Sequence, residues 1–266
     1  MDNSPMYYNA FPDPTGKIPN GIPAAYDNIT NRVQLYDCQQ SSLFVSESLS
    51  LQALAKATAS APPNVGAMLK KQSDEMSAAI NSVLWDASSS IYRQVDASPL
   101  QRGFSAPISP TSFYPMLGGV ASSAQAEAMV KNHLTNSSEF CVDAGPEFAA
   151  EGAVTCPFAL PSISRSDPNF YDNSYWRGRT WGPLNLLTWI SLSHPKYAAM
   201  PRVAAARKGL CKQSVALLLQ EWRERRHVHE NYNSTSGEGC DVGNSNPFYH
   251  WGSNLGYIAM REALAK

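Results

Sequence analysis

The sequence predicts an all-α protein whose helices belong to an α/α barrel or toroid and whose loops form a site at one end of the ring of helices. Apolar residues recur every three or four positions in several segments, which are residues 43–60, 64–84, 121–134, 183–192, 201–224 and 246–265. Only residues 85–95 have the pattern of a small β-hairpin with a polar turn. Long loops rich in Pro, Gly, Asn and Asp separate the later helices, and such loops within a compact domain usually serve a site.

The first two helices are expected to form a helical hairpin. Residues 1–36 are rich in turn-forming Pro, Asn and Asp, so we expect an irregular segment there. The helix of residues 43–60 ends before Pro62, and Asn64 is placed to cap the helix of residues 64–84. Two helices joined by so short a connection pack against each other.

The later helices differ in how much of their surface is apolar. Residues 99–115 form a proline-rich loop that ends in a short helical turn, and a helix follows at residues 121–134. Pro183 is tolerated in the first turn of the next helix, which is apolar almost all round and should be deeply buried. The helix of residues 201–224 is amphipathic, and its expected core face consists of Val203, Leu210, Val215, Leu218, Leu219 and Trp222.

The composition favours a neutral substrate. The chain of 266 residues is 43% hydrophobic, and its 21 basic and 22 acidic residues give a net charge of -1. This balance supports neither nucleic acid nor an anionic membrane as a partner. No apolar run reaches the roughly 18 to 20 residues that span a bilayer. The N-terminus also lacks the features of a signal peptide, so we expect no membrane segment and no targeting signal in this sequence.

Cysteines and glycosylation sequons leave the compartment open. The sequence contains no C-x-x-C motif, and its five cysteines are widely spaced, at Cys38, Cys141, Cys156, Cys211 and Cys240. One disulfide, for example between Cys141 and Cys156, is compatible with an oxidising compartment. The sequence contains N-x-S/T sequons at Asn28, Asn136 and Asn233. Such sequons permit passage through a secretory pathway but do not require it.

The segment Tyr171–Leu187, YDNSYWRGRTWGPLNLL, combines flat aromatic rings, arginines and short polar side chains. The C–H faces of a pyranose ring stack on aromatic side chains, and the hydroxyl groups of the sugar form charge-assisted hydrogen bonds. The segment therefore suits a sugar-binding pocket. The alternative interpretation is a loop whose tryptophans anchor it to the core.

Several stretches of the sequence resemble glycoside hydrolase family 63. They are MDNSPMY, YWRGRTWGPLN, HENYN and NPFYHWGSNLG, in the same order and at similar spacing as in the catalytic (α/α)6 barrel of that family. The family includes mannosyl-oligosaccharide glucosidase, bacterial α-glucosidases and mannosylglycerate hydrolase, and trehalase of family 37 is a more distant relative. Because the resemblance covers only the C-terminal part of the family's barrel, it implies a partial (α/α)6 barrel.

The resemblance implies an inverting glycosidase with two catalytic carboxyl groups. Asp2, in a D-N-x-P stretch, matches the general acid, and Glu230, in an E-N-Y motif, matches the general base. The acid protonates the departing oxygen while the base activates a water on the opposite ring face, so the two carboxyl groups should lie roughly 6.5 to 9.5 Å apart. Alternatively, Asp2 is a frayed terminal residue and Glu230 an exposed loop carboxylate.

The resemblance and the side-chain chemistry also indicate substrate-binding residues. The candidates are Tyr175, Trp176, Arg177, Arg179, Trp181, Asn231, Tyr232, His250 and Trp251. The arginines would hold sugar hydroxyls or orient a carboxylate, although one of the two is alternatively a structural ion-pair partner. The tryptophans are either pocket walls or core residues, and His250 either bonds to a sugar hydroxyl or is structural. In the same loop as Glu230, the acidic residues Glu238 and Asp241 are expected to be turn formers.

Metal, cofactor and other enzyme classes have little support. His227 and His229 form an H-x-H pattern, but no third ligand follows at a sensible spacing, so we predict no metal site and no cofactor. The sequence contains no G-x-S-x-G elbow, no P-loop and no G-x-G-x-x-G motif. Acyl transfer, phosphoryl transfer and dinucleotide binding therefore lack motif evidence.

Residues 1–266 are expected to form a single catalytic-type domain, the C-terminal part of a longer barrel. An incomplete ring of helices exposes apolar faces, which the missing N-terminal half of the barrel or an oligomeric partner would cover. The predicted function is an inverting α-glycosidase that releases a terminal α-linked glucose or mannose from an oligosaccharide or from a small glycoside such as mannosylglycerate. The alternative is a non-catalytic carbohydrate-binding protein or an inactive fragment. Both an endomembrane or secretory compartment and the cytoplasm stay open, because the resembled proteins differ in this respect.

Overall fold

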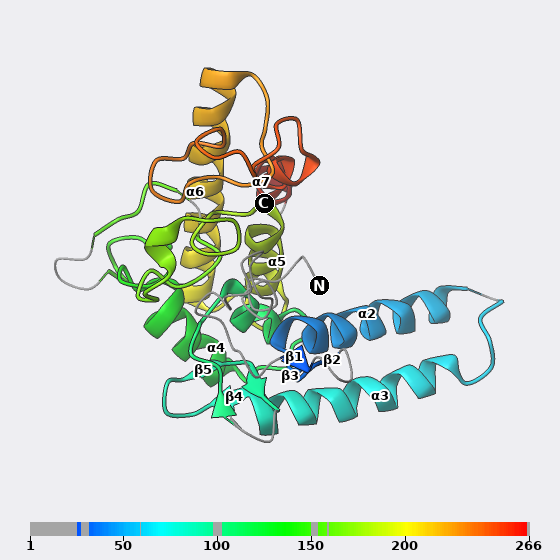
Figure 1. Cartoon of the computed structure of the whole chain (residues 1–266). Helices are drawn as coiled ribbons and strands as arrows, with labels where there is room; N and C mark the ends of the chain where they lie inside the picture. Colours follow the sequence, from blue (N-terminus) through cyan, green and yellow to red (C-terminus); the bar gives the residue numbers. More distant parts are fainter. Residues whose placement is uncertain are drawn as a thin grey trace.

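Helices dominate the structure (Figure 1). The computed structural model describes residues 26–27, 32–58, 60–97, 103–149, 154–158 and 160–264. Its helices are α2 (Cys38–Ala57), α3 (Val65–Ala79), α4 (Ser123–Met129), α5 (Gly182–Ser193), α6 (Pro201–Arg225) and α7 (Asn254–Leu264). Single π-helical turns continue α3 over Ile80–Leu84 and α4 over Val130–Leu134. Short 3-10 turns occupy Pro110–Met116, Phe170–Asp172 and His250–Ser253. The predicted all-α class is confirmed.

Strands are short and pair locally. The predicted hairpin is confirmed, with β4 (Trp85–Asp86) antiparallel to β5 (Ile91–Tyr92). The sequence did not predict two further small antiparallel sheets. One pairs β1 (Tyr26–Asp27) with β2 (Arg32–Val33), and the other pairs β6 (Val95–Asp96) with both β3 (Leu35–Tyr36) and β7 (Gly103–Phe104). Each strand contains two residues, which is too few for an alternating pattern to be recognised. Residues 1–25 and 28–31 of the predicted irregular segment lie outside the described part of the chain.

The helices α2 and α3 form the predicted helical hairpin, which extends away from the other helices (Figure 1). Helix α2 begins at Cys38 rather than at Leu43, because the carboxylate of Asp37 caps it by accepting a hydrogen bond from the Gln40 amide at 2.8 Å. Helix α3 begins where expected. Asn64 does not cap it with its side chain, however, but adopts a left-handed backbone conformation with φ of 66°. It therefore closes the connection between the two helices as a turn residue.

Helices α5, α6 and α7 pack against one another beside the hairpin. Helix α5 is buried along most of its surface, as predicted, and exposes mainly Ile190, at 38%. The predicted core face of α6 is partly wrong, since Leu219 and Trp222 are 40% and 48% exposed while Gln213, Ser214 and Glu221 are buried. Gln213 and Glu221 point inward because they bind the long loops described below. No helix in the described part of the chain is long and apolar enough to span a bilayer.

Helices α2 and α7 each expose large apolar side chains. On α2, Leu51 and Leu54 are 48% and 60% exposed, and on α7, Met260 and Leu264 are 64% and 82% exposed. Exposed apolar surface of this kind is expected where an incomplete ring of helices meets another part of the protein. The expected cover, either further barrel helices or a partner subunit, stays a prediction.

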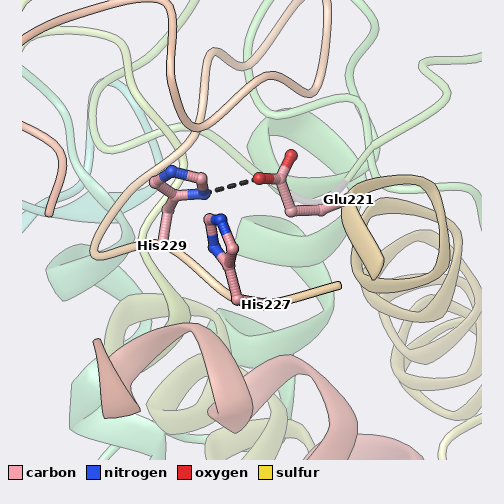
Figure 2. A group of neighbouring side chains, drawn as sticks. All are labelled: Glu221, His227 and His229. Atoms are coloured by element: carbon pink, nitrogen blue, oxygen red, sulfur yellow. Dashed lines mark ion pairs between the residues drawn. The ribbon is translucent and has the colours of Figure 1, made fainter. Parts of the chain in front are cut away.

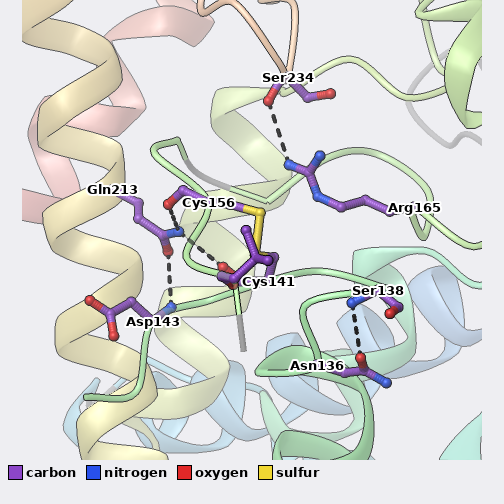
Figure 3. Close-up of a disulfide and its surroundings, with 9 residues drawn as sticks. Asn136, Ser138, Cys141, Asp143, Cys156, Arg165, Gln213 and Ser234 are labelled. Atoms are coloured by element: carbon purple, nitrogen blue, oxygen red, sulfur yellow. Dashed lines mark hydrogen bonds between the residues drawn. A yellow bond between two sulfur atoms is a disulfide. The ribbon is translucent and has the colours of Figure 1, made fainter. Parts of the chain in front are cut away.

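A disulfide and a buried glutamine hold the loop after α4 against α6 (Figure 3). Cys141 and Cys156 form the disulfide that the sequence left open. The Gln213 side chain donates hydrogen bonds to the carbonyl oxygens of Cys141 and Cys156, at 3.0 and 2.8 Å, and accepts one from the Asp143 amide at 3.4 Å. Because these bonds satisfy the buried amide of Gln213, they position the loop on α6 without a regular secondary structure.

His133, in the π-helical turn after α4, forms a buried ion pair. Its Nδ1 lies 2.8 Å from Glu139 Oε2, and its Nε2 lies 2.6 Å from the carbonyl oxygen of Ser89. Since both ring nitrogens face acceptors, the doubly protonated ring fits this position best. Burial alone lowers the pKa of His133, but the hydrogen bonds to Glu139 and Ser89 outweigh burial and raise the pKa above its ordinary value.

We predict that the His133 interaction stabilises the protein mainly at acidic pH. Because the folded-state pKa is raised above the unfolded value of about 6.5, the stabilisation is complete below about pH 6.5 and is lost as pH rises through the folded-state pKa. Urea unfolding of the wild type and of His133→Gln from about pH 5 to about pH 9 measures this difference. A difference in unfolding free energy that stays constant over this range would contradict the prediction.

We also predict that loss of the disulfide destabilises the chain by about 3 kcal/mol. The cysteines are 15 residues apart, and a closed loop of that length restricts the unfolded chain by about this amount. The measurement is the unfolding free energy of the double variant Cys141→Ser and Cys156→Ser. The matched control is Cys240→Ser, which removes an exposed thiol and should leave stability unchanged. An equal effect of both changes would show that the cross-link is not the cause.

Candidate active site

Glu230 lies in a segment that is held between two neighbouring segments by backbone hydrogen bonds. Tyr232 and Thr180 exchange both backbone hydrogen bonds, at 2.8 and 2.9 Å, and the Glu230 amide donates to the Asn246 carbonyl at 2.9 Å. The Ser245 hydroxyl donates to the Asn231 carbonyl at 2.6 Å. The stretches that carry the family resemblance around Thr180, Glu230 and Asn246 are therefore adjacent in space, although up to about seventy residues separate them in sequence.

An open cavity of about 320 Å³ lies beside Glu230, lined by Tyr175, Glu230, Asn244 and Asn246. The Glu230 residue is only 6% exposed, and the Tyr175 hydroxyl donates a hydrogen bond to Glu230 Oε1 at 3.2 Å. A carboxylate at a cavity wall, with one oxygen held by a phenol, can accept a proton from a bound water with the other oxygen. A larger cavity of about 710 Å³ beside α5 and α7 has no carboxyl group in its lining and does not suit this chemistry.

Sequence reasoning did not single out Asn244 and Asn246, although Asn246 begins the NPFYHWGSNLG stretch. Both asparagines line the cavity beside Glu230, and side-chain amides both donate and accept hydrogen bonds, as sugar hydroxyls require. The backbone pairing between the Glu230 segment and this stretch brings the asparagines to the cavity. No sequence pattern reveals that pairing.

The loop that carries Tyr175 has an unusual backbone. Tyr175 has a φ of 48°, which is rare for a bulky residue, and Gly178 has a φ of 95°. A Cβ atom on Gly178 would lie 2.2 Å from the Phe170 carbonyl oxygen, so only glycine fits there. The indole N–H of Trp181 donates to the Tyr175 carbonyl at 3.0 Å and helps to hold the loop. This backbone directs the Tyr175 hydroxyl at Glu230.

Three tryptophans pack together next to Tyr175. The rings of Trp176 and Trp181 are stacked, with centroids 3.6 Å apart, and Trp251 lies edge-on to Trp181 at 5.7 Å. Trp176 and Trp181 are 1% and 0% exposed and form an apolar cluster with Tyr114 and other buried residues. Of the two interpretations that the sequence allowed, this geometry matches core residues for Trp176 and Trp181, with the half-buried Trp251 at the edge.

Arg179 is fully buried and binds other protein groups. Its guanidinium donates to both carboxylate oxygens of Asp241, at 2.8 and 3.2 Å, and its Nε donates to Asn231 Oδ1. Asp241 also accepts a hydrogen bond from the side-chain amide of Asn233 at 2.8 Å. Burial alone raises the pKa of Asp241, but the bonds from Arg179 and Asn233 outweigh burial and lower the pKa. In this geometry Arg179 is a structural ion-pair partner, and Asp241 is its counter-charge rather than only a turn former.

The remaining predicted site residues lie at different depths. Arg177 pairs with the half-exposed Asp172 at 3.0 Å. Tyr232 is buried, and its hydroxyl accepts a hydrogen bond from the His229 amide at 3.0 Å. His250 is exposed and stacks on Tyr249, with ring centroids 5.2 Å apart. Asp2 lies outside the described residues, so its role as the acid stays a prediction.

Directly before Glu230 in the chain, a histidine pair meets a buried carboxylate of α6 (Figure 2). His229 Nδ1 lies 2.5 Å from Glu221 Oε1, and His227 lies beside them. Burial lowers the pKa of His229 and outweighs the opposing effect of Glu221. The sequence-based argument that His227 and His229 lack a third ligand is therefore corrected. It considered only residues that follow the H-x-H pattern, whereas Glu221 precedes the pattern.

Comparison with known proteins identifies the family. The sequence profile of the mannosylglycerate hydrolase MGH1-like glycoside hydrolase domain matches residues 1–252. The chain belongs to this glycoside hydrolase family. A comparison with curated proteins finds no match.

Solved structures confirm that the MGH1-like domain has the fold of part of an (α/α)6 barrel. The GH63 mannosylglycerate hydrolase from Thermus thermophilus, in complex with glucose, is 18% identical, with a TM-score of 0.62 over 85% of this chain and 45% of that chain. Neutral trehalase Nth1 from Saccharomyces cerevisiae is 15% identical, with a TM-score of 0.55 over 86% of this chain and 38% of that chain. The MGH1-like domain thus spans less than half the length of these solved chains. At these identities the likeness establishes the fold alone.

We predict that Asp241 and Asp172 differ sharply in their importance for stability. Asp241→Ala leaves the fully buried Arg179 charge without its partner and should lower the unfolding free energy by roughly 2–4 kcal/mol. Asp172→Ala breaks a similar but more exposed pair with Arg177 and should cost about 0–1 kcal/mol. Urea unfolding of both variants measures the difference. Equal losses would contradict the structural role assigned to Arg179.

Proposed function

We propose that the MGH1-like domain is the base-bearing part of an inverting α-glycosidase and that Glu230 is the general base. The observation that carries the proposal is the hydrogen bond that fixes one carboxylate oxygen of Glu230 on the Tyr175 hydroxyl at the wall of the cavity. Membership of a glycoside hydrolase family supports hydrolysis of a glycosidic bond as the reaction class.

In the proposed reaction, Glu230 removes a proton from a water as the water oxygen attacks the anomeric carbon. The glycosidic C–O bond breaks on the opposite face of the sugar ring, and its electron pair stays on the departing oxygen, which takes a proton from the general acid. We propose Asp2 as that acid. The Tyr175 bond occupies one oxygen of Glu230 and leaves the other for the water, while Asn244 and Asn246 can bind sugar hydroxyls.

The other candidate residues divide into two groups in this proposal. The exposed or half-buried side chains of Arg177, His250 and Trp251 can contact sugar at the rim of the site. The buried side chains position the loops and make no contact with substrate, and they are Trp176, Arg179, Trp181, Asn231 and Tyr232. This division follows from burial, because a fully covered side chain cannot reach a ligand without displacing the protein groups around it.

The proposed substrate carries a terminal α-linked glucose or mannose, either on an oligosaccharide or on a small glycoside such as mannosylglycerate. The family name and the solved mannosylglycerate hydrolase, which has also been obtained with Tris and D-glycerate at a TM-score of 0.61, support the small glycoside. A cavity of about 320 Å³ is at the lower end of the size of small-molecule sites and suits one sugar ring.

One observation favours the alternative of a carbohydrate-binding domain without activity of its own. The chain spans only 45% of the mannosylglycerate hydrolase chain, and the cavity beside Glu230 is open to solvent. In this alternative the cavity beside Glu230 binds sugar, and hydrolysis requires further barrel helices or a partner subunit.

We predict that Glu230→Gln abolishes hydrolysis while sugar binding survives. The amide keeps the size of the side chain but cannot accept a proton, so turnover should fall by roughly 10²–10⁴-fold. The measurement follows α-glucosides, α-mannosides and mannosylglycerate by NMR and records which anomer appears first. The matched control is Glu238→Gln, a more exposed glutamate of the same loop, which should retain activity.

Each outcome of this assay is decisive for part of the proposal. Release of the inverted anomer by the wild type, lost in Glu230→Gln only, supports the mechanism. Release of the retained anomer, or full activity of Glu230→Gln, overturns the role of Glu230. Sugar binding without turnover by the folded wild-type chain favours the binding-only alternative.

A further inference from the structure

Three side chains that can bind a metal ion meet at His229, the residue directly before Glu230 in the chain (Figure 2). Glu221 comes from the last turns of α6, and His227 and His229 come from the segment that follows. One ligand atom of each residue lies within 4.8 Å of the others. The imidazole rings of His227 and His229 have centroids 4.6 Å apart. Residues from two segments thus converge on one point.

The surroundings of this cluster leave its polar atoms incompletely satisfied. Glu221 and His229 are 1% and 2% exposed, and the buried Nδ1 of His227 has no hydrogen-bond partner in the described part of the chain. A buried carboxylate is costly unless a cation or several donors neutralise it. The nearby Arg225 faces Glu238 instead, at 3.9 Å. The cluster therefore offers two imidazole nitrogens and one carboxylate to a cation.

Close packing fixes one of the rings. A Cβ atom on Gly239 would lie 2.4 Å from the His229 ring, so glycine at this position lets the backbone of the 238–241 loop cover the imidazole. The His229 amide is in turn bonded to the Tyr232 hydroxyl. Packing against the ring and a fixed backbone both limit the freedom of this side chain, which favours metal binding because little freedom is lost when the metal binds.

We propose that Glu221, His227 and His229 bind a divalent transition-metal ion, with Zn²⁺ as the best match. Imidazole nitrogen and carboxylate oxygen are usual Zn²⁺ ligands, whereas Mg²⁺ and Ca²⁺ require mostly oxygen ligands. Tetrahedral Zn²⁺ with bonds of about 2.0–2.1 Å separates its ligand atoms by roughly 3.3 Å. The Glu221 and His229 atoms, now 2.5 Å apart, would open slightly, and His227 would move inward. A water would complete the coordination.

The proposed ion is a structural brace for the segment that carries Glu230. It would join the end of α6 to the residue directly before Glu230, and none of its ligands is among the residues that line the cavity. The ion would therefore hold the candidate base in place without contacting substrate. The inference needs no assumption about the sugar, because metal binding is measured in the absence of substrate.

We predict that the metal-free chain, with any purification tag removed, binds one equivalent of Zn²⁺. Calorimetric titration of the chelator-treated protein measures affinity and stoichiometry, and elemental analysis after gel filtration measures the retained metal. Co²⁺ should give the visible absorption of a tetrahedral site. His227→Gln and Glu221→Gln should each weaken Zn²⁺ binding by about 100-fold or more, because each removes one of only three protein ligands. Zn²⁺ should also raise the Tm of the wild type through mass action.

Two control variants make the result specific. His133→Gln alters a second buried His–Glu pair, which has no third ligand among the described residues, and should leave the stoichiometry at one. Cys240→Ser removes the exposed thiol next to Gly239 and should also leave binding unchanged. Circular dichroism establishes that each variant is folded, and His227→Gln carries the test if Glu221→Gln does not fold. No retained Zn²⁺ in the folded wild type, or unchanged binding by His227→Gln, would overturn the proposal.

Discussion

The geometry of the candidate site depends on one buried arginine. Arg179 directly precedes Thr180, which pairs with Tyr232, and its guanidinium joins Asn231 to Asp241 and to the Glu238 carbonyl. Loops lose conformational entropy when they are ordered, and none of these segments is stabilised by a helix or a long strand of its own. A buried charge with a single set of partners permits only one arrangement of the three loops. The position of Glu230 follows from this arrangement.

Around this interaction, the residues of YWRGRTW have separate structural roles. Trp176 and Trp181 stack in the core, Gly178 permits a backbone that no other residue adopts easily, and Trp181 holds the Tyr175 carbonyl. Tyr175 alone of these residues lines the cavity. A stretch that looks like a sugar-binding surface by composition is therefore mostly a scaffold that directs one tyrosine. This explains why aromatic content by itself does not separate a binding wall from a core.

Periodicity predicted the helices α3, α4 and α6 well, because their apolar residues recur at helical spacing over several turns. It failed where local chemistry or distant contacts decide. The Asp37 cap moves the start of α2, two-residue strands carry no pattern, and Trp222 is exposed because α6 turns Glu221 inward to His229. The sequence located the segments of the site and the candidate base. It could not show that Asn244 and Asn246 lie beside that base or that Glu221 pairs with His229, because these contacts join residues whose spacing has no periodic signature.

Several groups in the described part of the chain orient Glu230. Tyr175 donates a hydrogen bond to the carboxylate of Glu230, and the carbonyl of Asn246 accepts one from the backbone amide of Glu230. Arg179 binds Asn231, the residue after Glu230. The proposed base thus has orienting contacts from its backbone and from its side chain within the described residues. Inversion also requires an acid on the opposite face of the sugar and walls that hold the ring between the two carboxyl groups. If the chain binds sugar but does not cleave it, the acid side and those walls are therefore the first parts of the proposed reaction to test.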